Sequence, residues 1–254
     1  MPARVSALRS KSYKLKWNRD TAAFMSSIQA AFLYYTRRNI MGDLRNTIRV
    51  IKERDPAATS SIQVALLYSG FHAILGYRMS HWLYLHKCFF CARLISQLTR
   101  FFTGIEIHPG ATIGKGLFID HGSGVVIGET AVIGDNCTIY QGVTLGGTGK
   151  HTGKRHPTLG NNVMVGAGAK VLGPFTVGDN SKIAAGAVVL DAIPENSTAV
   201  GIPARVIKRG DKKVENDLDQ VHIPDPVSQE FCRLQARLDA LEKMLSEINE
   251  KNDE

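Results

Sequence analysis

The sequence predicts an N-terminal helical domain, a left-handed parallel β-helix built from hexapeptide repeats, and a short C-terminal helix. Three observations lead to this fold class. The glycines are unevenly placed, because 21 of the 24 lie between Gly104 and Gly210. Before that region, long apolar stretches with few breaking residues are typical of helices. Within it, aliphatic residues recur at a fixed interval of six, which indicates a solenoid.

The six-residue interval is the strongest of these signals. It fits neither a helix nor an alternating strand, whereas a solenoid uses one short strand and one turn per hexapeptide. Three hexapeptides close one triangular coil, and small residues after each aliphatic anchor permit the tight corner. Thirteen anchors, a little over four coils, are Ile107, Ile113, Ile119, Ile127, Ile133, Ile139, Leu145, Leu159, Val165, Val171, Val177, Ile183 and Val189.

The chain divides into four predicted regions, with boundaries at residues 1–40, 41–103, 104–210 and 211–254. The second holds the helices, which are expected at Ser61–Tyr68, Phe71–Leu85 and Phe89–Phe102. Asp55 and Pro56 mark a helix break and restart. Cys88 and Cys91 form a single C-x-x-C pair. Since no second pair completes a zinc site, we interpret them as buried helix residues.

Nearly all of the net positive charge lies in the first region. The whole chain carries +8, but residues 1–40 hold eight Lys or Arg and one acid, so the remainder is nearly neutral. This argues against a nucleic-acid-binding face on the main domain. No stretch is long enough to span a bilayer. We expect residues 1–40 to be a poorly ordered extension and the protein to be cytoplasmic, unless this acid-poor extension is an organellar transit peptide.

The C-terminal region contains a short apolar seam. After a linker with Pro224 and Pro226, apolar residues are spaced by four and three at Leu234, Leu238, Leu241, Leu245 and Ile248. Such spacing is typical of a heptad. Two interpretations stand: a helix packed on its own subunit, or a small coiled coil that joins protomers.

Two interruptions of the six-residue period hold the candidate catalytic residues. The first, two residues long, contains Asp120 and His121, and the second, eight residues long, contains Arg155 and His156. Long insertions in regular repeats are usually functional. Histidine is a suitable general base because its pKa is close to neutral pH. The alternative is a histidine that is merely buried or exposed.

The sequence resembles the serine O-acetyltransferases, the first enzymes of cysteine biosynthesis. The resemblance runs from about residue 42 to about residue 210. It is carried by these motifs: Asp55-Pro56-Ala57, Gly70-Phe71-His72-Ala73, Ile107-His108-Pro109, Asp120-His121-Gly122-Ser123-Gly124, Gly128-Glu129-Thr130, Gly146-Gly147-Thr148-Gly149-Lys150, Arg155-His156-Pro157 and Gly201-Ile202-Pro203-Ala204-Arg205.

The resemblance implies the activity and the acceptor-site residues. Acetyl-CoA donates its acetyl group to the hydroxyl of L-serine, with His121 as the base and Glu106 as the carboxylate that holds its ring. Glu106 departs from the Asp that many members have there. Arg155 and His156 are expected to hold the serine carboxylate. Asp55 and Asp120 are expected to hold its amine, although Asp55 could instead be a helix N-cap.

The resemblance also implies how acetyl-CoA binds. In the family, CoA lies in a groove between the coils of neighbouring subunits. Gly147, Ala167 and Ala185 are the small residues expected beside its pantetheine arm, and Lys170 or Lys182 is expected near a phosphate. Backbone N–H groups of Gly146 and Gly147 would serve the oxyanion. No metal is expected.

The same resemblance implies partners. A homotrimer is expected as the active unit, and L-cysteine is expected as a feedback inhibitor at the serine site. Some relatives dock a terminal Ile into O-acetylserine sulfhydrylase, but this sequence ends in Lys251-Asn252-Asp253-Glu254. That departure argues against the complex here.

Three other functions fit the sequence less well. A hexapeptide acyltransferase for homoserine or a sugar would not explain the helical domain together with Arg155 and His156. A γ-type carbonic anhydrase needs three metal-binding histidines, whose pattern is not reproduced. A purely structural solenoid would not need its interruptions to carry Asp120-His121 and Arg155-His156.

Overall fold

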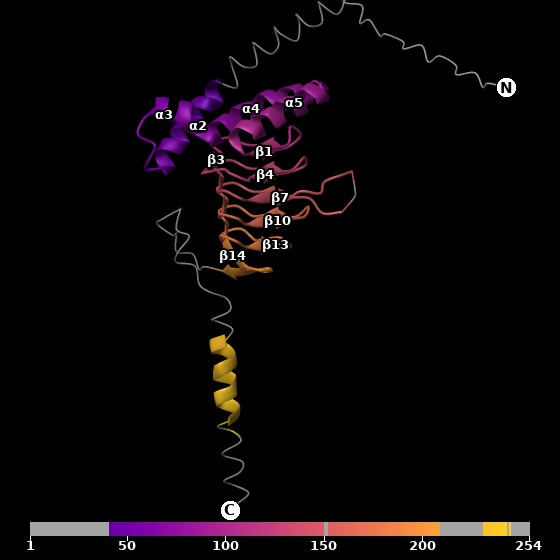
Figure 1. The fold of residues 1–254 in the computed structure, drawn as a ribbon. Coiled ribbons are helices and arrows are strands. Elements are labelled where there is room, and N and C mark those ends of the chain that lie inside the picture. The colour runs from indigo at the N-terminus through magenta and orange to yellow at the C-terminus, as the bar shows by residue number, and fades with distance from the viewer. Residues whose placement is uncertain (1–40, 150–151, 209–230, 243, 245–254) are drawn as a thin grey trace, which may run out of the picture. The chain divides into compact units, whose positions relative to one another are not determined.

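A computed structural model describes residues 41–149, 152–208, 231–242 and 244. Helices lie at one end of a stack of short strands (Figure 1). The predicted extension 1–40, the linker after residue 210, and the seam residues Leu245 and Ile248 lie outside the described residues.

From residue 41 onward, four helices precede the strands: α2 (Met41–Arg54), α3 (Ser61–Leu67), α4 (Ser69–Leu85) and α5 (Phe89–Thr103). The side chain of Ser60 accepts a hydrogen bond from the backbone N–H of Gln63 and caps α3. The interpretation of Asp55 as a helix N-cap is therefore wrong, because a turn separates Asp55 from α3. Helix α5 ends at Gly104, whose φ of 71° is the left-handed conformation that glycine adopts without strain.

Thirteen short strands follow, and each contains one of the thirteen predicted anchors. They are β1 (Glu106–Ile107), β2 (Thr112–Ile113), β3 (Phe118–Ile119), β4 (Val126–Ile127), β5 (Val132–Ile133), β6 (Thr138–Ile139), β7 (Thr144–Gly146), β8 (Thr158–Leu159), β9 (Met164–Val165), β10 (Lys170–Leu172), β11 (Thr176–Val177), β12 (Lys182–Ile183) and β13 (Val188–Val189). Every anchor is buried in one continuous core. Full burial of such a side chain contributes roughly 1.5–3 kcal/mol.

The strands form three sheets that are the faces of the coil. Sheet A has the strand order β1-β4-β7-β10-β13, and sheet B has the order β11-β8-β5-β2. In sheet C, the coil contributes the strands β12-β9-β6-β3, in that order. Successive strands visit A, B and C in turn, and each pairs in parallel with the strand one coil away, as Ile107 does with Ile127. The predicted left-handed parallel β-helix is confirmed.

A hairpin ends the solenoid. Strand β14 (Ser197–Gly201) pairs in parallel with β12 and antiparallel with β15 (Ala204–Lys208). The six-residue period gives no signal for this hairpin, because its strands are five residues long and antiparallel.

The helices cap the first coil. The carbonyl groups of that coil have no strand beyond them, so side chains of α4 and α5 donate to them instead. The hydroxyl of Tyr77 donates to Ala111 O (2.7 Å), and that of Ser96 donates to Ile107 O (2.8 Å). Arg78 donates to Ile113 O (2.9 Å). The backbone of α4 also approaches β3 closely at Gly70, where a Cβ would lie 2.2 Å from the carbonyl oxygen of Ile119.

The expected burial of both cysteines in the C-x-x-C pair is wrong. Cys91 is exposed on α5, and Cys88, which precedes that helix, is partly exposed. The reason is that α5 turns only one side toward the core, where Ala92 and Ser96 are its buried residues.

The C-terminal region contains a helix over residues 231–242. All its described side chains are exposed, including the seam residues Leu234, Leu238 and Leu241. Whether this seam packs on its own subunit or pairs between protomers stays a prediction.

The close approach at Gly70 gives a stability prediction. Gly70→Ala should lower the free energy of unfolding by ~1–3 kcal/mol, because the added methyl group forces α4 away from β3. The loss should appear as a lower midpoint in urea unfolding. Gly153→Ala is the matched control, since a Cβ there meets nothing within 4 Å. Equal midpoints for the two variants would contradict this account of the interface.

Candidate active site

The candidate residues gather at two different corners of the triangular coil. One is the A–B corner, where the chain passes from sheet A to sheet B, and it carries Arg155 and His156 after β7. The other is the C–A corner, where the chain passes from sheet C to sheet A, and it carries Asp120 and His121 after β3. Sheet A separates the two corners, and no hydrogen bond or ion pair among the described residues links these two pairs directly.

Three sequence motifs stack at the A–B corner. His108 follows β1, Glu129 follows β4 and Arg155 precedes β8, so each belongs to a successive coil. The backbone of Gly128 touches the ring of His156, because a Cβ at Gly128 would lie 2.0 Å from its Cδ2. Only glycine leaves room for this ring, which is 8% exposed.

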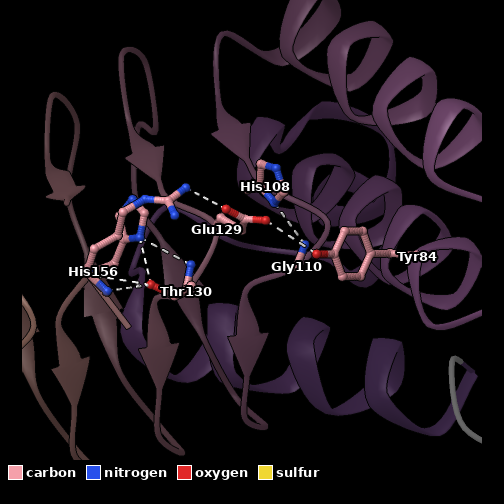
Figure 2. Close-up of polar contacts among 7 residues, drawn as sticks. Tyr84, His108, Gly110, Glu129, Thr130 and His156 are labelled. Carbon is pink, nitrogen blue, oxygen red and sulfur yellow. Dashed lines mark hydrogen bonds and ion pairs between the residues drawn. The ribbon is translucent and has the colours of Figure 1, made fainter. Parts of the chain in front are cut away.

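Thr130 contacts Nδ1 of His156 and thereby selects the tautomer of its neutral ring; Figure 2 shows the two residues side by side. The Oγ1 of Thr130 accepts the backbone N–H groups of Arg155 (3.0 Å) and His156 (3.1 Å). Its own proton is then directed at His156 Nδ1, 2.9 Å away, which also accepts the backbone N–H of Thr130 at 3.2 Å. A backbone N–H can only donate, so Nδ1 carries no proton and Nε2 is an N–H donor. Burial, and then the charge of Arg155, lowers the pKa of His156.

Glu129 connects Arg155 to the helical domain. Its Oε2 lies 2.5 Å from Nη2 of Arg155, and its Oε1 accepts from the hydroxyl of Tyr84 on α4 at 3.4 Å. Burial alone would raise the pKa of Glu129, but the hydrogen bond from Arg155 and the charges of His108 and Arg155 outweigh it and lower the pKa. Beside it, burial lowers the pKa of His108, whose Nδ1 accepts the N–H of Gly110 at 3.0 Å.

At the C–A corner, His121 has an unusual backbone conformation. Its φ is 56°, a left-handed value that costs a residue other than Gly or Asn about 1 kcal/mol. The left-handed glycines of this corner in later coils, Gly142, Gly168 and Gly186, continue the position of Gly124, so His121 lies in the part of the turn that is inserted here. The side chain of His121 is 76% exposed, and its Nε2 lies 3.9 Å from Oδ1 of Asp120. A strained histidine that projects from a corner supports a functional role.

Asp55 and Asp120, the two residues expected at an amine site, lie close enough for their charges to interact. The Oδ2 of Asp55 accepts from the hydroxyl of Tyr68 at 2.6 Å, and its Oδ1 accepts from the N–H of Ala57 at 2.8 Å. Burial raises the pKa of Asp120, and the negative charge of Asp55 adds to this rise. Burial, with the hydrogen bond to Asp55, raises the pKa of Tyr68 to about 12. Two carboxylates held near each other in this way favour a cation.

Glu106 is not paired with His121 in the described chain. It forms ion pairs with Arg100 (3.3 Å) and Arg93 (4.0 Å), both on α5. The expected role of Glu106 beside the histidine ring stays a prediction.

The residues expected near CoA divide between the two corners. Ala167 and Ala185 lie in the turns after β9 and β12, which stack below the turn of His121 at the C–A corner. Next to them, a Cβ at Gly168 or Gly186 would meet nothing within 4 Å, so this corner has open space. Gly147 lies instead at the A–B corner against Arg155 and His156.

Lys170 and Lys182 lie on different faces. Lys170 is on sheet A, and its Nζ donates to the carbonyl of Gly142 and, at 3.2 Å, to Thr144 Oγ1. Lys182 is on sheet C.

The sequence reasoning missed four side chains that complete the two clusters. Tyr68 and Tyr84 come from the helical domain, where helical spacing gives no sign of a site. Glu129 and Thr130 were noted only as part of a motif. Both follow the anchor Ile127 and Gly128, one coil before the insertion that contains Arg155. That position in the repeat is the signal that could have placed them beside Arg155.

Two further findings concern ligands and membranes. Within residues 41–149, 152–208 and 231–242, no group of three or more His, Cys, Asp or Glu side chains is arranged to hold a metal ion. In the same part of the chain, no helix has both the length and the apolar character that crossing a membrane requires.

Comparison with known proteins gives three matching family models. Residues 12–75 match a model described as serine acetyltransferase, N-terminal. Residues 124–147 match the hexapeptide repeat of succinyl-transferase, and residues 156–191 match the bacterial transferase hexapeptide with six repeats.

Curated relatives match most of the chain. A serine acetyltransferase of Bacillus subtilis is 55% identical over 208 residues, which are 82% of this chain and 96% of that protein. One from Synechococcus elongatus is 55% identical over 201 residues, covering 79% of this chain and 82% of its own length.

Solved structures match as well. Neisseria gonorrhoeae serine acetyltransferase has a TM-score of 0.69 at 41% identity, with coverage of 76% of this chain and 73% of that one. A serine acetyltransferase in complex with cysteine has a TM-score of 0.71 at 41% identity, with 74% of both chains covered. A complex with CoA matches with a TM-score of 0.64 at 41% identity, covering 68% and 72% of the two chains.

The contacts of His156 predict its titration. The neutral ring should carry its single proton on Nε2. Because the pKa of His156 is lowered from its ordinary value of 6.5, the ring should become protonated only at a pH below 6.5. The unfolded chain binds that proton first as the pH falls, so the stability from this group is present above pH 6.5 and is lost below it. Imidazole nitrogen NMR measures both the tautomer and the midpoint.

A matched pair of variants isolates the Thr130 contact. Thr130→Val removes the hydroxyl that favours the neutral ring and should move the midpoint of His156 upward. Thr112→Val, at an exposed strand position, should leave it unchanged. A midpoint at or above 6.5 in the unaltered protein, or a proton on Nδ1, would refute the assignment.

Proposed function

The chain belongs to the serine acetyltransferase family and acts as a serine O-acetyltransferase with acetyl-CoA as the acetyl donor, and we propose that the two corner clusters bind opposite ends of L-serine. The observation that carries this proposal is the placement of polar groups: Asp55 and Asp120 lie at one corner, and Arg155, paired with Glu129, lies beside a donating His156 at the other. A serine zwitterion needs both.

The C–A corner supplies the amine site. Asp55 and Asp120 interact through their charges, and burial penalises the ionised form of Asp120. An ammonium group between them relieves both effects. Tyr68 keeps the carboxylate of Asp55 in one orientation through its 2.6 Å hydrogen bond.

The A–B corner supplies the carboxylate site. Arg155 presents a guanidinium whose geometry suits a carboxylate. His156 adds the Nε2–H donor that its contacts with Thr130 leave available. Arg155 would supply the positive charge, and His156 a neutral donor, to the same carboxylate.

The position of these corners supports a homotrimer. Serine is too short to extend across a whole sheet face, so we propose that the C–A corner of one subunit meets the A–B corner of the next. Such a contact joins different surfaces on the two subunits and closes into a ring under threefold symmetry. Each trimer would then hold three complete sites.

His121 is proposed as the general base. Its Nε2 takes the proton from the serine hydroxyl as that oxygen attacks the thioester carbonyl carbon. The tetrahedral intermediate collapses by breaking the C–S bond, and the CoA thiolate receives the proton from the imidazolium. Glu106 would orient the ring by holding its other nitrogen, which requires it to turn from Arg100 and Arg93.

Acetyl-CoA is proposed to lie along the C–A corner below His121. Ala167 and Ala185, with the open space beside Gly168 and Gly186, support a narrow path for the pantetheine arm. Lys170 would meet a phosphate only after leaving its contact with Gly142. Gly147, placed at the A–B corner, would reach the thioester from the neighbouring subunit, with its backbone N–H facing the oxyanion.

The remaining partner proposals follow from the same sites. L-Cysteine differs from serine only at the reacting atom, so it should occupy both half-sites as an inhibitor. A solved relative is described as a complex with cysteine, which supports this. A cytoplasmic location is proposed from the unpaired cysteines of the described chain. We do not propose a complex with O-acetylserine sulfhydrylase.

A thiol-release assay with acetyl-CoA tests the activity and the base together. L-Serine should give a higher kcat/KM than L-homoserine or a sugar acceptor, which are the alternative substrates. His121→Ala should lower kcat by ~10²–10⁴ without changing the oligomeric state. His86→Ala, at the end of α4, is the control. Wild-type turnover in His121→Ala would exclude this histidine as the base, and preference for homoserine would favour the alternative acceptor.

A further inference from the structure

Arg155 is held by a carboxylate that the chemistry of acetyl transfer does not require. Among the described residues, the side chain of Arg155 forms its ion pair with Glu129, between Nη2 and Oε2. Nη2 of Arg155 donates to Oε2 of Glu129, and Figure 2 shows the carboxylate of Glu129 beside Tyr84, whose hydroxyl donates to its other oxygen. An arginine has five N–H donors, so this contact leaves others for a substrate.

The backbones on both sides of this ion pair are fixed to each other. Thr130, next to Glu129, accepts the backbone N–H groups of Arg155 and His156. Lys154 reaches back across the same turn, and its Nζ donates to Thr130 O at 2.7 Å. With both backbones held, the contact between Glu129 and Arg155 determines where the guanidinium points.

Helix α4 in turn fixes Glu129. The ring of Tyr84 packs edge-on against His108 and Phe89, with centroids 6.0 Å and 5.1 Å apart. Its hydroxyl contacts the carboxylate of Glu129, and a Cβ on neighbouring Gly110 would lie 3.1 Å from the Tyr84 ring. The carboxylate, whose side chain is 32% exposed, is therefore contacted by α4 on one side and by Arg155 on the other.

We propose that Glu129 is a positioning residue for acceptor recognition. It orients Arg155 toward the serine carboxylate, and Tyr84 extends this control to the helical domain. The inference rests on the proposed function of the A–B corner. Without the ionised Glu129, the long side chain of Arg155 regains rotamer freedom that serine must then remove on binding. The effect should therefore appear in the KM for serine and not in the KM for acetyl-CoA.

A double-mutant cycle with Arg155 tests this mechanism. Glu129→Gln keeps the size of the side chain and removes its charge, so the KM for serine should rise ~10-fold, with kcat within about 3-fold of wild type. Arg155→Ala should also raise the KM for serine. The double variant should be no worse than Arg155→Ala alone, because Glu129 acts only through Arg155.

Two controls separate positioning from general damage. Glu53→Gln removes an exposed carboxylate that is likewise paired with an arginine, Arg49 on α2, and should change neither KM. Tyr84→Phe removes only the hydroxyl and should raise the KM for serine by ~3-fold. Calorimetric titration with L-serine should show the same order of affinities without turnover.

The outcomes distinguish the inference from the proposed function. Multiplicative effects in the double variant, a lowered KM for serine in Glu129→Gln, or an equal rise in the KM for acetyl-CoA would overturn the positioning role. In these cases the wild-type enzyme still acetylates serine and the proposed function stands. A wild-type protein that neither binds nor acetylates L-serine would overturn both.

Discussion

An aliphatic side chain must return to the axis of the coil at every sixth residue, and this requirement governs where the other residues can lie. Each strand is held by one buried anchor, and the chain must turn before the next. The corners of successive coils therefore stack on one another, and any extra residue must leave the coil at a corner. The candidate residues of the coil therefore lie at its corners or on its outer faces, because the interior is filled by aliphatic and small side chains.

This constraint explains why motifs far apart in the sequence form one cluster. His108, Glu129 and Arg155 belong to three coils, yet they meet because each follows an anchor of sheet A. Arg155 belongs to the inserted residues between β7 and β8, which allows it to reach Glu129 of the preceding coil. The same geometry separates Arg155 from His121, since sheet A lies between their corners. This separation is the basis for the proposal that each acceptor site is shared by two subunits.

The coil was predictable from the sequence to the level of single strands, because its period is local and repeated. All thirteen anchors lie in strands and are buried. The helical domain was less predictable in detail. The contacts of Tyr68 with Asp55 and of Tyr84 with Glu129 depend on how α3 and α4 pack onto the coil, and helical spacing contains no information on that packing. Glu106 shows the same limit, because its arginine partners come from α5.

Mixing defective subunits tests the proposal that each active site is shared by two subunits. His121→Ala impairs one corner and Arg155→Ala the other, so trimers formed from equal amounts of both should contain some boundaries with two intact corners. Random assembly gives about a quarter of all boundaries in this state. At serine concentrations below the wild-type KM, the mixture should recover about that fraction of wild-type activity, although each variant alone is nearly inactive. Activity no greater than the mean of the two variants would contradict the shared site.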